Sequence, residues 1–148
     1  MNIKIRKMDM SDVQFALKAE MDAFGKTLSE KMLVNEMLHN KFAHYYVALV
    51  DDKRAGYVGF WLTEPNAEIL NIVVAPAVRR QNVGSVLMDY VIATCKEKNI
   101  EMLTLEVRQT NQPAVDFYEK YGFKKEALRK RYYPDGEDAL LMVKRIGG

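Results

Sequence analysis

The stretch NIVVAPAVRRQNVGSVLMDYVIATC (residues 71–95) joins an apolar run, a basic turn and a segment with helical periodicity. The run ends at Pro76, whose nitrogen has no hydrogen to donate to a neighbouring strand. After Asn82, apolar residues recur every three or four positions, which predicts a helix of about four turns with one buried side. We therefore expect a strand that leads through a tight turn into a helix. The buried side of that helix carries Val83, Val86, Leu87, Tyr90, Val91 and Cys95.

The rest of the chain supplies further strands and helices around this unit. The run AEILNIVVA (residues 67–75) is apolar almost throughout, which is typical of a central strand covered on both faces. Ser11 is the expected cap of a first helix, and Asn111 and Gly122 are expected to bound a later one. The pattern predicts an α/β (α+β) chain with a mixed sheet. The other expected strands lie at 3–8, 102–107, 123–133 and 138–146, and a hairpin is expected over 45–64 with its turn at 51–54. The other expected helices lie at 11–24, 29–38 and 111–122.

Length and composition indicate one globular domain over residues 1–148. Of these residues 49% are hydrophobic, and no linker, repeat or low-complexity tract interrupts them. The 22 basic and 20 acidic residues give a net charge of +2, which argues against a nucleic-acid or membrane partner. One cysteine and two histidines exclude a disulfide framework and make no recognisable metal cluster, so no structural metal is expected. The polar N-terminus lacks a signal or membrane segment, and we expect a cytoplasmic protein.

The turn between the strand and the helix has the features of an anion site. The first N–H groups of a helix point outward, and the helix dipole places roughly half a positive charge there. Arg79 and Arg80 stand just before that end, and guanidinium groups bind phosphate oxygens in a bidentate manner. A diphosphate is the expected guest, although two solvated surface arginines would give the same pattern. The expected backbone donors belong to Gln81, Asn82, Val83, Gly84 and Ser85.

The spacing of this turn excludes two common nucleotide-binding motifs. The G-x-x-x-x-G-K-[ST] spacing of a Walker loop and its lysine are missing, and the dinucleotide fingerprint would need more glycines than Gly84. The turn instead resembles the acyl-CoA signature of the GNAT acetyltransferases, written Q/R-x-x-G-x-G/A. Arg79 takes the first place, Asn82 stands where glycine is usual, and Gly84 takes the last. Asparagine enters the left-handed backbone region more readily than other residues with a Cβ, so Asn82 is expected to replace glycine at a modest cost.

The resemblance extends over most of residues 67–142. The segments ILNIVVAPAVRRQNVGSVLM, LTLEVRQTNQPAVDFYEKYGF and RYYPDGEDALLM stand in the order and spacing of the RimI-type branch. That branch contains bacterial ribosomal-protein-alanine acetyltransferases and the archaeal and eukaryotic catalytic subunits that acetylate protein N-termini. The resemblance implies a GNAT fold, with a mixed, mostly antiparallel sheet of about six to seven strands and about four flanking helices. It also implies direct acetyl transfer from acetyl-CoA to an amine, without an acyl-enzyme.

The resemblance assigns roles to individual residues. Glu106 matches the proton acceptor, and Glu68, which opens the central strand, is the competing candidate. Tyr118 matches the general acid toward the leaving thiolate, and Asn111 matches a position that contacts the cofactor. Taken alone, these residues would be surface carboxylates, a core tyrosine and a helix cap. The implied oxyanion donors are the backbone N–H groups of Ile72, Val73 and Val74.

The implied acceptor is the N-terminal α-amine of a protein or peptide. Such an amine has a pKa of about 8 and is partly deprotonated at neutral pH, whereas lysine, at about 10.4, is almost fully protonated. Residues 24–28, beginning with Phe24, and Tyr132 or Tyr133 are expected to wall the acceptor slot, with hairpin packing as the alternative for one of the two tyrosines. The alternatives are a lysine or small-amine acetyltransferase, a non-catalytic module for CoA or a nucleotide, and a nucleic-acid patch at KKEALRKRYY. We expect a monomer or a weak homodimer.

Overall fold

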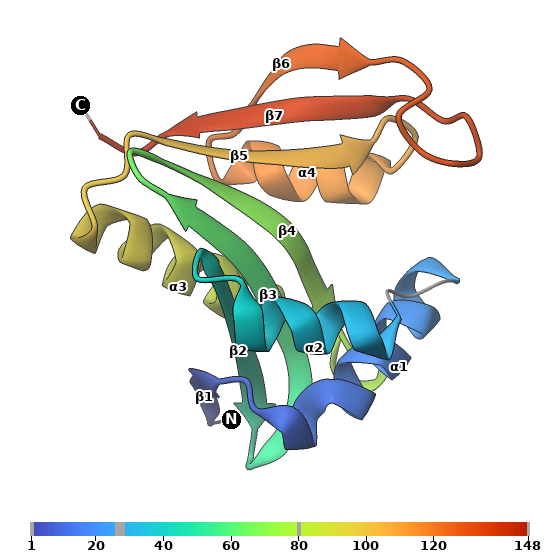
Figure 1. The fold of residues 1–148 in the computed structure, drawn as a ribbon. Coiled ribbons are helices and arrows are strands. Elements are labelled where there is room, and N and C mark those ends of the chain that lie inside the picture. Colours follow the sequence, from blue (N-terminus) through green and yellow to red (C-terminus); the bar gives the residue numbers. More distant parts are fainter. Residues whose placement is uncertain (1, 26–28, 80, 148) are drawn as a thin grey trace.

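The computed structural model describes residues 2–25, 29–79 and 81–147. In this part of the chain seven strands form one sheet in the order β1-β2-β3-β4-β5-β7-β6, and four α-helices pack against it (Figure 1). Only β4 and β5 pair in parallel among neighbours of this sheet, which confirms the predicted mixed, mostly antiparallel architecture. The strands are β1 (Ile3–Lys7), β2 (Ala43–Val50), β3 (Lys53–Thr63), β4 (Asn66–Val74), β5 (Met102–Arg108), β6 (Lys124–Arg129) and β7 (Ala139–Arg145). The helices are α1 (Val13–Phe24), α2 (Glu30–His39), α3 (Val83–Glu97) and α4 (Gln112–Lys120), with 3-10 helices η1 (Met10–Asp12) and η2 (Pro76–Val78).

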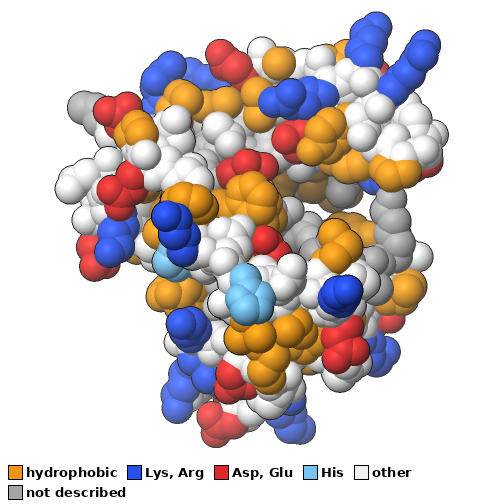
Figure 2. Space-filling view, in the orientation of Figure 1, with side chains coloured by type: hydrophobic (Ala, Val, Ile, Leu, Met, Phe, Trp, Pro, Cys, Tyr) orange, Lys and Arg blue, Asp and Glu red, His pale blue; other side chains and the backbone are white. Residues whose placement is uncertain are grey.

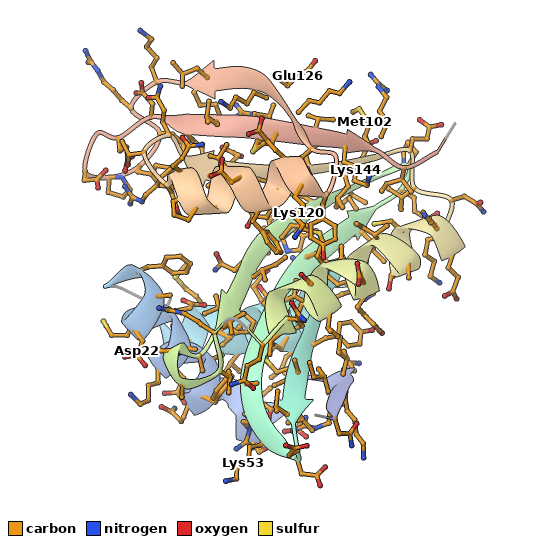
Figure 3. All side chains as sticks on the ribbon, turned by 180° about the vertical axis from the view of Figure 1, so that it is seen from behind. Asp22, Lys53, Met102, Lys120, Glu126 and Lys144 are labelled. Atoms are coloured by element: carbon orange, nitrogen blue, oxygen red, sulfur yellow. The ribbon has the colours of Figure 1, made fainter. Side chains whose placement is uncertain are left out.

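The helices cover both faces of the sheet. Helices α1 and α2 lie on the face seen in Figure 1, and α3 and α4 lie on the face seen from behind in Figure 3. Two apolar clusters fill these layers: Ala16 and Leu33 pack with Val73 on the first face, and Leu87 packs with Ile69 on the second. Strand β4 therefore contributes to both clusters, as its continuous apolar composition predicts. None of the helices in the described part of the chain combines the length and apolar character that a membrane crossing requires.

The opening stretch folds as predicted. Strand β4 ends at Val74, Pro76 begins η2, and α3 begins at Val83. Within α3 the side chains of Val83, Leu87, Val91 and Cys95 are buried, and those of Val86 and Tyr90 are partly buried. Burial raises the pKa of the Cys95 thiol to about 11, so this cysteine is a core residue and a weak nucleophile.

The expected cap of the first helix is wrong. The capping residue at this end is Asp9, whose side chain accepts a hydrogen bond from the Ser11 backbone N–H at 2.9 Å. Asp9 caps the η1 turn, and α1 begins only after that turn, at Val13. The next aspartate, Asp12, is fully buried and binds the guanidinium groups of Arg6 and Arg54 at 2.8 and 2.7 Å. Two charge-assisted contacts therefore tie the start of α1 to β1 and β3. The Ser11 hydroxyl donates to the Asp9 carboxylate and accepts a hydrogen bond from Arg54 at 3.1 Å, so it does not cap α1.

The last hairpin also differs from the prediction. Strand β6 ends at Arg129 rather than at Tyr133, so both tyrosines of the expected acceptor slot lie in the β6–β7 connection. Here the backbone groups bond within the connection: Arg131 donates to the Asp138 carboxylate at 2.9 Å, and Tyr133 donates to the Glu137 carbonyl at 3.2 Å. Because these bonds replace the ladder, the connection folds back on itself and leaves the sheet.

Strands β4 and β5 separate halfway along their length. They pair only over residues 66–69 and 102–105, and Figure 1 shows them diverging beyond that point. In the ladder with β3, Gly59 pairs with Asn71 and Phe60 pairs with Ile69, which leaves Leu70 as the extra residue of a β-bulge. A bulge bends its strand and increases the local twist. The bend at Leu70 thus turns the second half of β4 away from β5 and opens the sheet.

Candidate active site

The divergence of β4 and β5 opens a cavity of about 590 Å³ in the middle of the sheet. Its walls are residues 69–74 of β4 and 105–108 of β5, with contributions from α1, α4 and the β6–β7 connection. Figure 2 shows the molecule hollowed between its two halves, with apolar and acidic side chains on the walls. With Arg79 from the turn before α3, six separate parts of the chain contribute residues to this one space.

Most of the residues predicted for the site meet in this cavity. Those that line it are Phe24, Ile72, Val73, Val74, Arg79, Glu106, Asn111, Tyr118 and Tyr133. The predicted residues that do not line it are Glu68, Gln81, Asn82, Val83, Gly84, Ser85 and Tyr132. Arg80 and residues 26–28 lie outside the described part of the chain.

The cavity exposes an open backbone edge of β4. Beyond Ile69, β4 keeps its partner β3 but has lost β5. In an antiparallel ladder alternate residues direct their N–H and C=O groups to one neighbour and the others point away from it. Between Asn71 and Val74, the groups that point away from β3 therefore face the cavity without a strand partner. They are suited to hold a carbonyl oxygen, as predicted for Ile72 to Val74.

The turn before α3 adopts the conformation that the sequence predicts. Asn82 has φ 64° and ψ 17°, in the left-handed region, which confirms that asparagine takes the place of glycine here. Val86 donates the first intrahelical bond, to the Asn82 carbonyl at 3.0 Å. The N–H groups of Val83, Gly84 and Ser85 precede that bond and have no acceptor within the helix. Because the Val83 side chain is buried, its part in a ligand site is limited to the backbone.

Gly84 supports the fit of this turn to a bound phosphate. A Cβ at this position would meet the Phe117 ring and the Val74 side chain at 3.7 Å, an ordinary contact distance. The protein's own packing therefore does not require glycine, although glycine within a helix costs about 0.5–1 kcal/mol relative to alanine. Close approach of a ligand to the backbone is a physical reason to keep it. Arg79, which lines the cavity, adds a positive charge beside the turn.

Replacing Asn82 with glycine is expected to preserve or slightly tighten acetyl-CoA binding. Glycine adopts the left-handed region without strain, and the Asn82 side chain makes no capping hydrogen bond that would be lost. Asn82→Val is the matched contrast, because a β-branched residue is strained at this φ and should weaken binding. Isothermal titration calorimetry with acetyl-CoA measures both affinities. A clear loss in Asn82→Gly would mean that the asparagine side chain itself contacts the ligand.

Glu106 projects from β5 into the cavity. Its side chain is only 18% exposed, and its Oε2 atom is buried without a hydrogen-bond partner among the described residues. The Arg129 Nε lies 3.2 Å from that oxygen and gives electrostatic support from a half-exposed position. Because the Glu106 side chain lines the cavity, the rest of its carboxylate is available to accept a proton from a ligand there. This geometry fits a general base.

Glu68 and Tyr132 lie beside Glu106 rather than on the cavity wall. Burial raises the pKa of Glu68, the charge of Glu106 raises it further, and Arg129 opposes this effect. Burial, the charge of Glu106 and a hydrogen bond with it also raise the pKa of Tyr132. Glu68 is thus a neighbouring carboxylate whose charged form Glu106 disfavours, and Tyr132 lies near enough to Glu106 to be affected in the same way. Among the described residues, no three His, Cys, Asp or Glu side chains are grouped so as to hold a metal ion.

Tyr118 and Asn111 enter the cavity from α4. Burial, with a smaller contribution from Tyr133, raises the pKa of Tyr118 to about 12, so the phenol is protonated at neutral pH and can donate. The Tyr118 ring also packs edge-on against Phe123, with 5.8 Å between the ring centroids, so Tyr118 both lines the cavity and belongs to the core. Asn111 caps α4 by accepting the Ala114 N–H at 3.3 Å, as predicted, while it lines the cavity.

Arg108 is a site residue that sequence reasoning missed. Its guanidinium binds Asp135 and Glu137 at 2.8 Å each and lies over the Tyr133 ring, 4.1 Å from the centroid. Glu137 also accepts the backbone N–H of Thr110 at 3.2 Å. These contacts fasten the β6–β7 connection to the end of β5 and hold Tyr133 at the cavity. The available signal was charge complementarity between the segments LEVRQT and DGED.

Glu20 is a second missed residue. It lies on α1, four positions after the buried Ala16, and is itself 2% exposed at the cavity wall. The Tyr57 hydroxyl donates a hydrogen bond to its carboxylate. A charged residue on the apolar face of an amphipathic helix was the sequence signal, because such a position needs a polar partner.

Comparison with known proteins agrees with this geometry. Residues 13–123 match the model of the Acetyltransferase (GNAT) family. A Bacillus subtilis (strain 168) protein, provisionally named ribosomal protein bS18-alanine N-acetyltransferase, is 38% identical over 93% of this chain and 92% of its own. An N-alpha-acetyltransferase of Sulfurisphaera tokodaii is 32% identical over 95% of this chain and 91% of its own.

The fold is shared with solved structures of the same kind. The crystal structure of the ribosomal-protein-S18-alanine N-acetyltransferase from Escherichia coli matches with a TM-score of 0.90 at 28% identity, over 99% of this chain and 96% of that one. The family uses acetyl-CoA, and the open β4 edge, the left-handed turn at Asn82 and the exposed helix N-terminus fit such a ligand. The chain belongs to the GNAT family of acetyltransferases, and it is an enzyme that transfers an acetyl group from acetyl-CoA to an amine.

Proposed function

We propose that this enzyme acetylates the N-terminal α-amine of a protein or peptide. The observation that carries the proposal is the largely buried carboxylate of Glu106, which lines the same cavity as Tyr118 and the open edge of β4. An α-amine is deprotonated in a roughly 300-fold larger fraction than a lysine at neutral pH. One carboxylate therefore suffices as the base. The N-terminal acetyltransferases among the relatives support the same acceptor.

In the proposed reaction, acetyl-CoA supplies the thioester that is attacked. Glu106 accepts the proton that the attacking amine loses, directly or through a water molecule, as the C–N bond forms. The N–H groups at the open edge of β4 stabilise the negative charge on the carbonyl oxygen. Tyr118 donates a proton to the sulfur as the C–S bond breaks, so CoA leaves as the thiol. The turn before α3 and Arg79 hold the diphosphate, and Asn111 adds a contact from α4.

The proposed acceptor slot has aromatic walls from two elements. Phe24 is 48% exposed at the end of α1 and lines the cavity, and Tyr133 lines it from the β6–β7 connection. The Arg108 network fixes Tyr133, while Tyr132 lies near Glu106, whose charge raises the pKa of the Tyr132 phenol. We therefore assign Tyr133 to the slot wall and Tyr132 to support of the base. Aromatic side chains on the cavity wall beside an acidic base are suited to an extended chain that ends in an amine.

Peptides with free N-termini are expected to be acetylated at least about 100-fold faster than N-terminally blocked copies of the same sequence, because of the difference in amine protonation. Each peptide of the pair contains a lysine, and mass spectrometry locates the acetyl group. Equal rates on the blocked copies would sink the N-terminal assignment in favour of a lysine acetyltransferase. Acetylation of simple amines, with both peptides inert, would favour a small-molecule enzyme.

The proposal includes the setting in which the enzyme works. We propose a cytoplasmic enzyme, formed by a single domain over residues 1–148, that acts as a monomer or a weak homodimer. Size-exclusion chromatography with light scattering at several concentrations measures the oligomeric state.

A further inference from the structure

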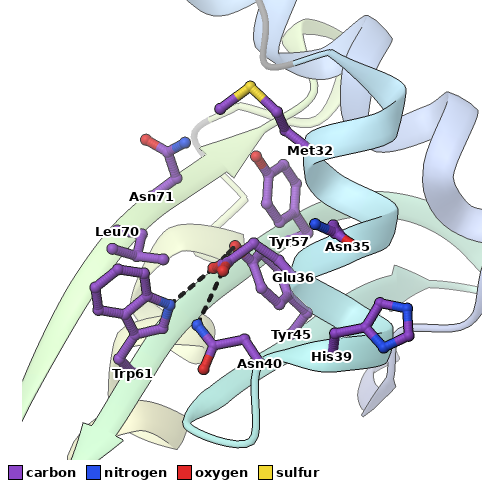
Figure 4. Close-up of a pocket in the computed structure, with 10 residues that line it drawn as sticks. All are labelled: Met32, Asn35, Glu36, His39, Asn40, Tyr45, Tyr57, Trp61, Leu70 and Asn71. Atoms are coloured by element: carbon purple, nitrogen blue, oxygen red, sulfur yellow. Dashed lines mark hydrogen bonds between the residues drawn. The ribbon is translucent and has the colours of Figure 1, made fainter.

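A second cavity, of about 750 Å³, adjoins the active site on the face that carries α2. It lies between α2 and strands β3 and β4 (Figure 4). Leu70 and Asn71 line both this cavity and the active-site cavity. The bulged segment of β4 thus connects the place where the acceptor amine reacts with a second space beside it.

Glu36 is the acidic residue of the second cavity. It projects from α2 toward β3, and Figure 4 shows its carboxylate between Trp61 and Asn40. Its Oε1 accepts hydrogen bonds from the Trp61 indole at 2.8 Å and the Tyr45 hydroxyl at 3.2 Å, and its Oε2 accepts one from the Asn40 amide at 2.9 Å. Three neutral donors from α2's end, β2 and β3 therefore fix the orientation of the carboxylate. A carboxylate accepts about four hydrogen bonds, so one site on Oε2 remains for a ligand.

The charge of Glu36 has no counterion in the described part of the chain. Glu36 takes part in none of the ion pairs there, and no lysine or arginine is among the described residues that line its cavity. Burial, followed by the charge of Glu36, raises the pKa of Tyr45, so the Tyr45 hydroxyl that bonds Glu36 stays a neutral donor. A charge held by neutral dipoles in a partly closed space attracts a cation.

The walls of this cavity also suit a cation. Trp61, Tyr45 and Tyr57 present aromatic rings to it, and tryptophan is the side chain with the strongest cation–π attraction. Tyr45 lies against Gly59, where any Cβ would come within 2.4 Å of its ring, so this arrangement is sterically fixed. Leu70 adds an apolar surface for a hydrocarbon stem. A fixed carboxylate with aromatic and apolar walls matches a lysine or arginine side chain.

Resting on the proposed N-terminal activity, we propose that the second cavity binds a basic side chain of the acceptor polypeptide, a few residues after its acetylated N-terminus, through Glu36 and Trp61. An extended chain advances about 3.3 Å per residue, and the two cavities share β4, so the first few side chains are within reach. The cavity then selects acceptors by charge downstream of the reacting amine, independently of the first residue.

The test is a set of peptides with free N-termini in which one arginine moves through positions 2 to 6 of an otherwise neutral sequence. At one or two positions arginine is expected to raise kcat/KM roughly tenfold over glutamine, chiefly through KM, and glutamate at the same position is expected to lower it. In Glu36→Gln the arginine-to-glutamine ratio should fall to about one, because the ion pair is lost while the residue keeps its shape. Glu126→Gln, on the remote edge strand β6, is the matched control and should keep the wild-type ratio.

The outcomes separate this inference from the proposed function. Peptides that react at every position without an arginine preference, or a preference that persists in Glu36→Gln, would overturn the basic-side-chain site alone. Free-N-terminus peptides that all react no faster than their blocked copies would overturn both. Rapid, Glu36-dependent acetylation of a diamine, with peptides inert, would reassign the cavity to a small-molecule acceptor. The glutamate peptides on wild-type enzyme test the charge preference even if Glu36→Gln folds poorly.

Discussion

Glu106→Gln is expected to lower kcat/KM for a peptide acceptor by about 10²–10⁴, the range that general base catalysis contributes. Glutamine has the size of glutamate but cannot accept a proton from the amine. The fold should tolerate this substitution, because the half-exposed Arg129 guanidinium can bind water when its charged partner is lost. Steady-state rates at saturating acetyl-CoA, with acetyl-CoA affinity measured separately, distinguish lost catalysis from lost binding.

Glu68→Gln is the matched control for this prediction. Glu68 carries the same functional group on the adjacent strand but does not line the cavity, so its loss should have a much smaller effect. A larger loss in Glu68→Gln than in Glu106→Gln would transfer the role of base to Glu68. Normal rates in both variants would show that no carboxylate of this pair takes the proton.

Tyr118→Phe is expected to lower kcat by about 10²-fold or more, the lower end of what a positioned acid contributes. Phenylalanine keeps the packing against Phe123 and Phe117 but has no proton to give to the departing sulfur. Acetyl-CoA binding should change little. Tyr90→Phe, on α3 and outside the cavity wall, removes a hydroxyl from a comparable ring and serves as the control.

The pH dependence of the wild-type rate follows from the same residues. Because the pKa of Tyr118 is raised to about 12, the acid stays protonated throughout the range in which activity is measured. The rate should rise with pH as the acceptor α-amine loses its proton at about 7.7–8.0, and no alkaline fall should come from Tyr118. A fall in kcat centred well below pH 11 that is absent from Tyr118→Phe would contradict the raised pKa of Tyr118.

Much of the fold was predictable because its signals are local. Helical spacing in α3, the polar cap at Asn111 and the turn at Gly122 each lie within one element, and the structure confirms them. Errors came where a distant partner competes with a local one. Ser11 does not cap α1 because its hydroxyl bonds Asp9 and the distant Arg54, and β6 ends early because the residues after it bond within the connection.

The site was predictable in part and for a similar reason. Motif positions gave Glu106, Tyr118, Arg79 and Asn111, and the fold brings these to one cavity, although their roles stay predictions. Arg108 and Glu20 were missed because each acts through contacts with residues far away in the chain. Glu36 was missed likewise, since its partner Trp61 lies on another element.

By itself, the sequence determined the strand–turn–helix unit with which residues 71–95 begin the site. Pro76 ends the ladder, Asn82 tolerates a positive φ, and the apolar spacing buries one side of α3, all by short-range sterics and solvation. Only the tertiary structure decided where the sheet opens. The bulge at Leu70 depends on the register between β3 and β4, which is set by packing across the whole sheet rather than by any residue's own preference. That opening turns scattered motif residues into one cavity and places the Glu36 cavity beside it.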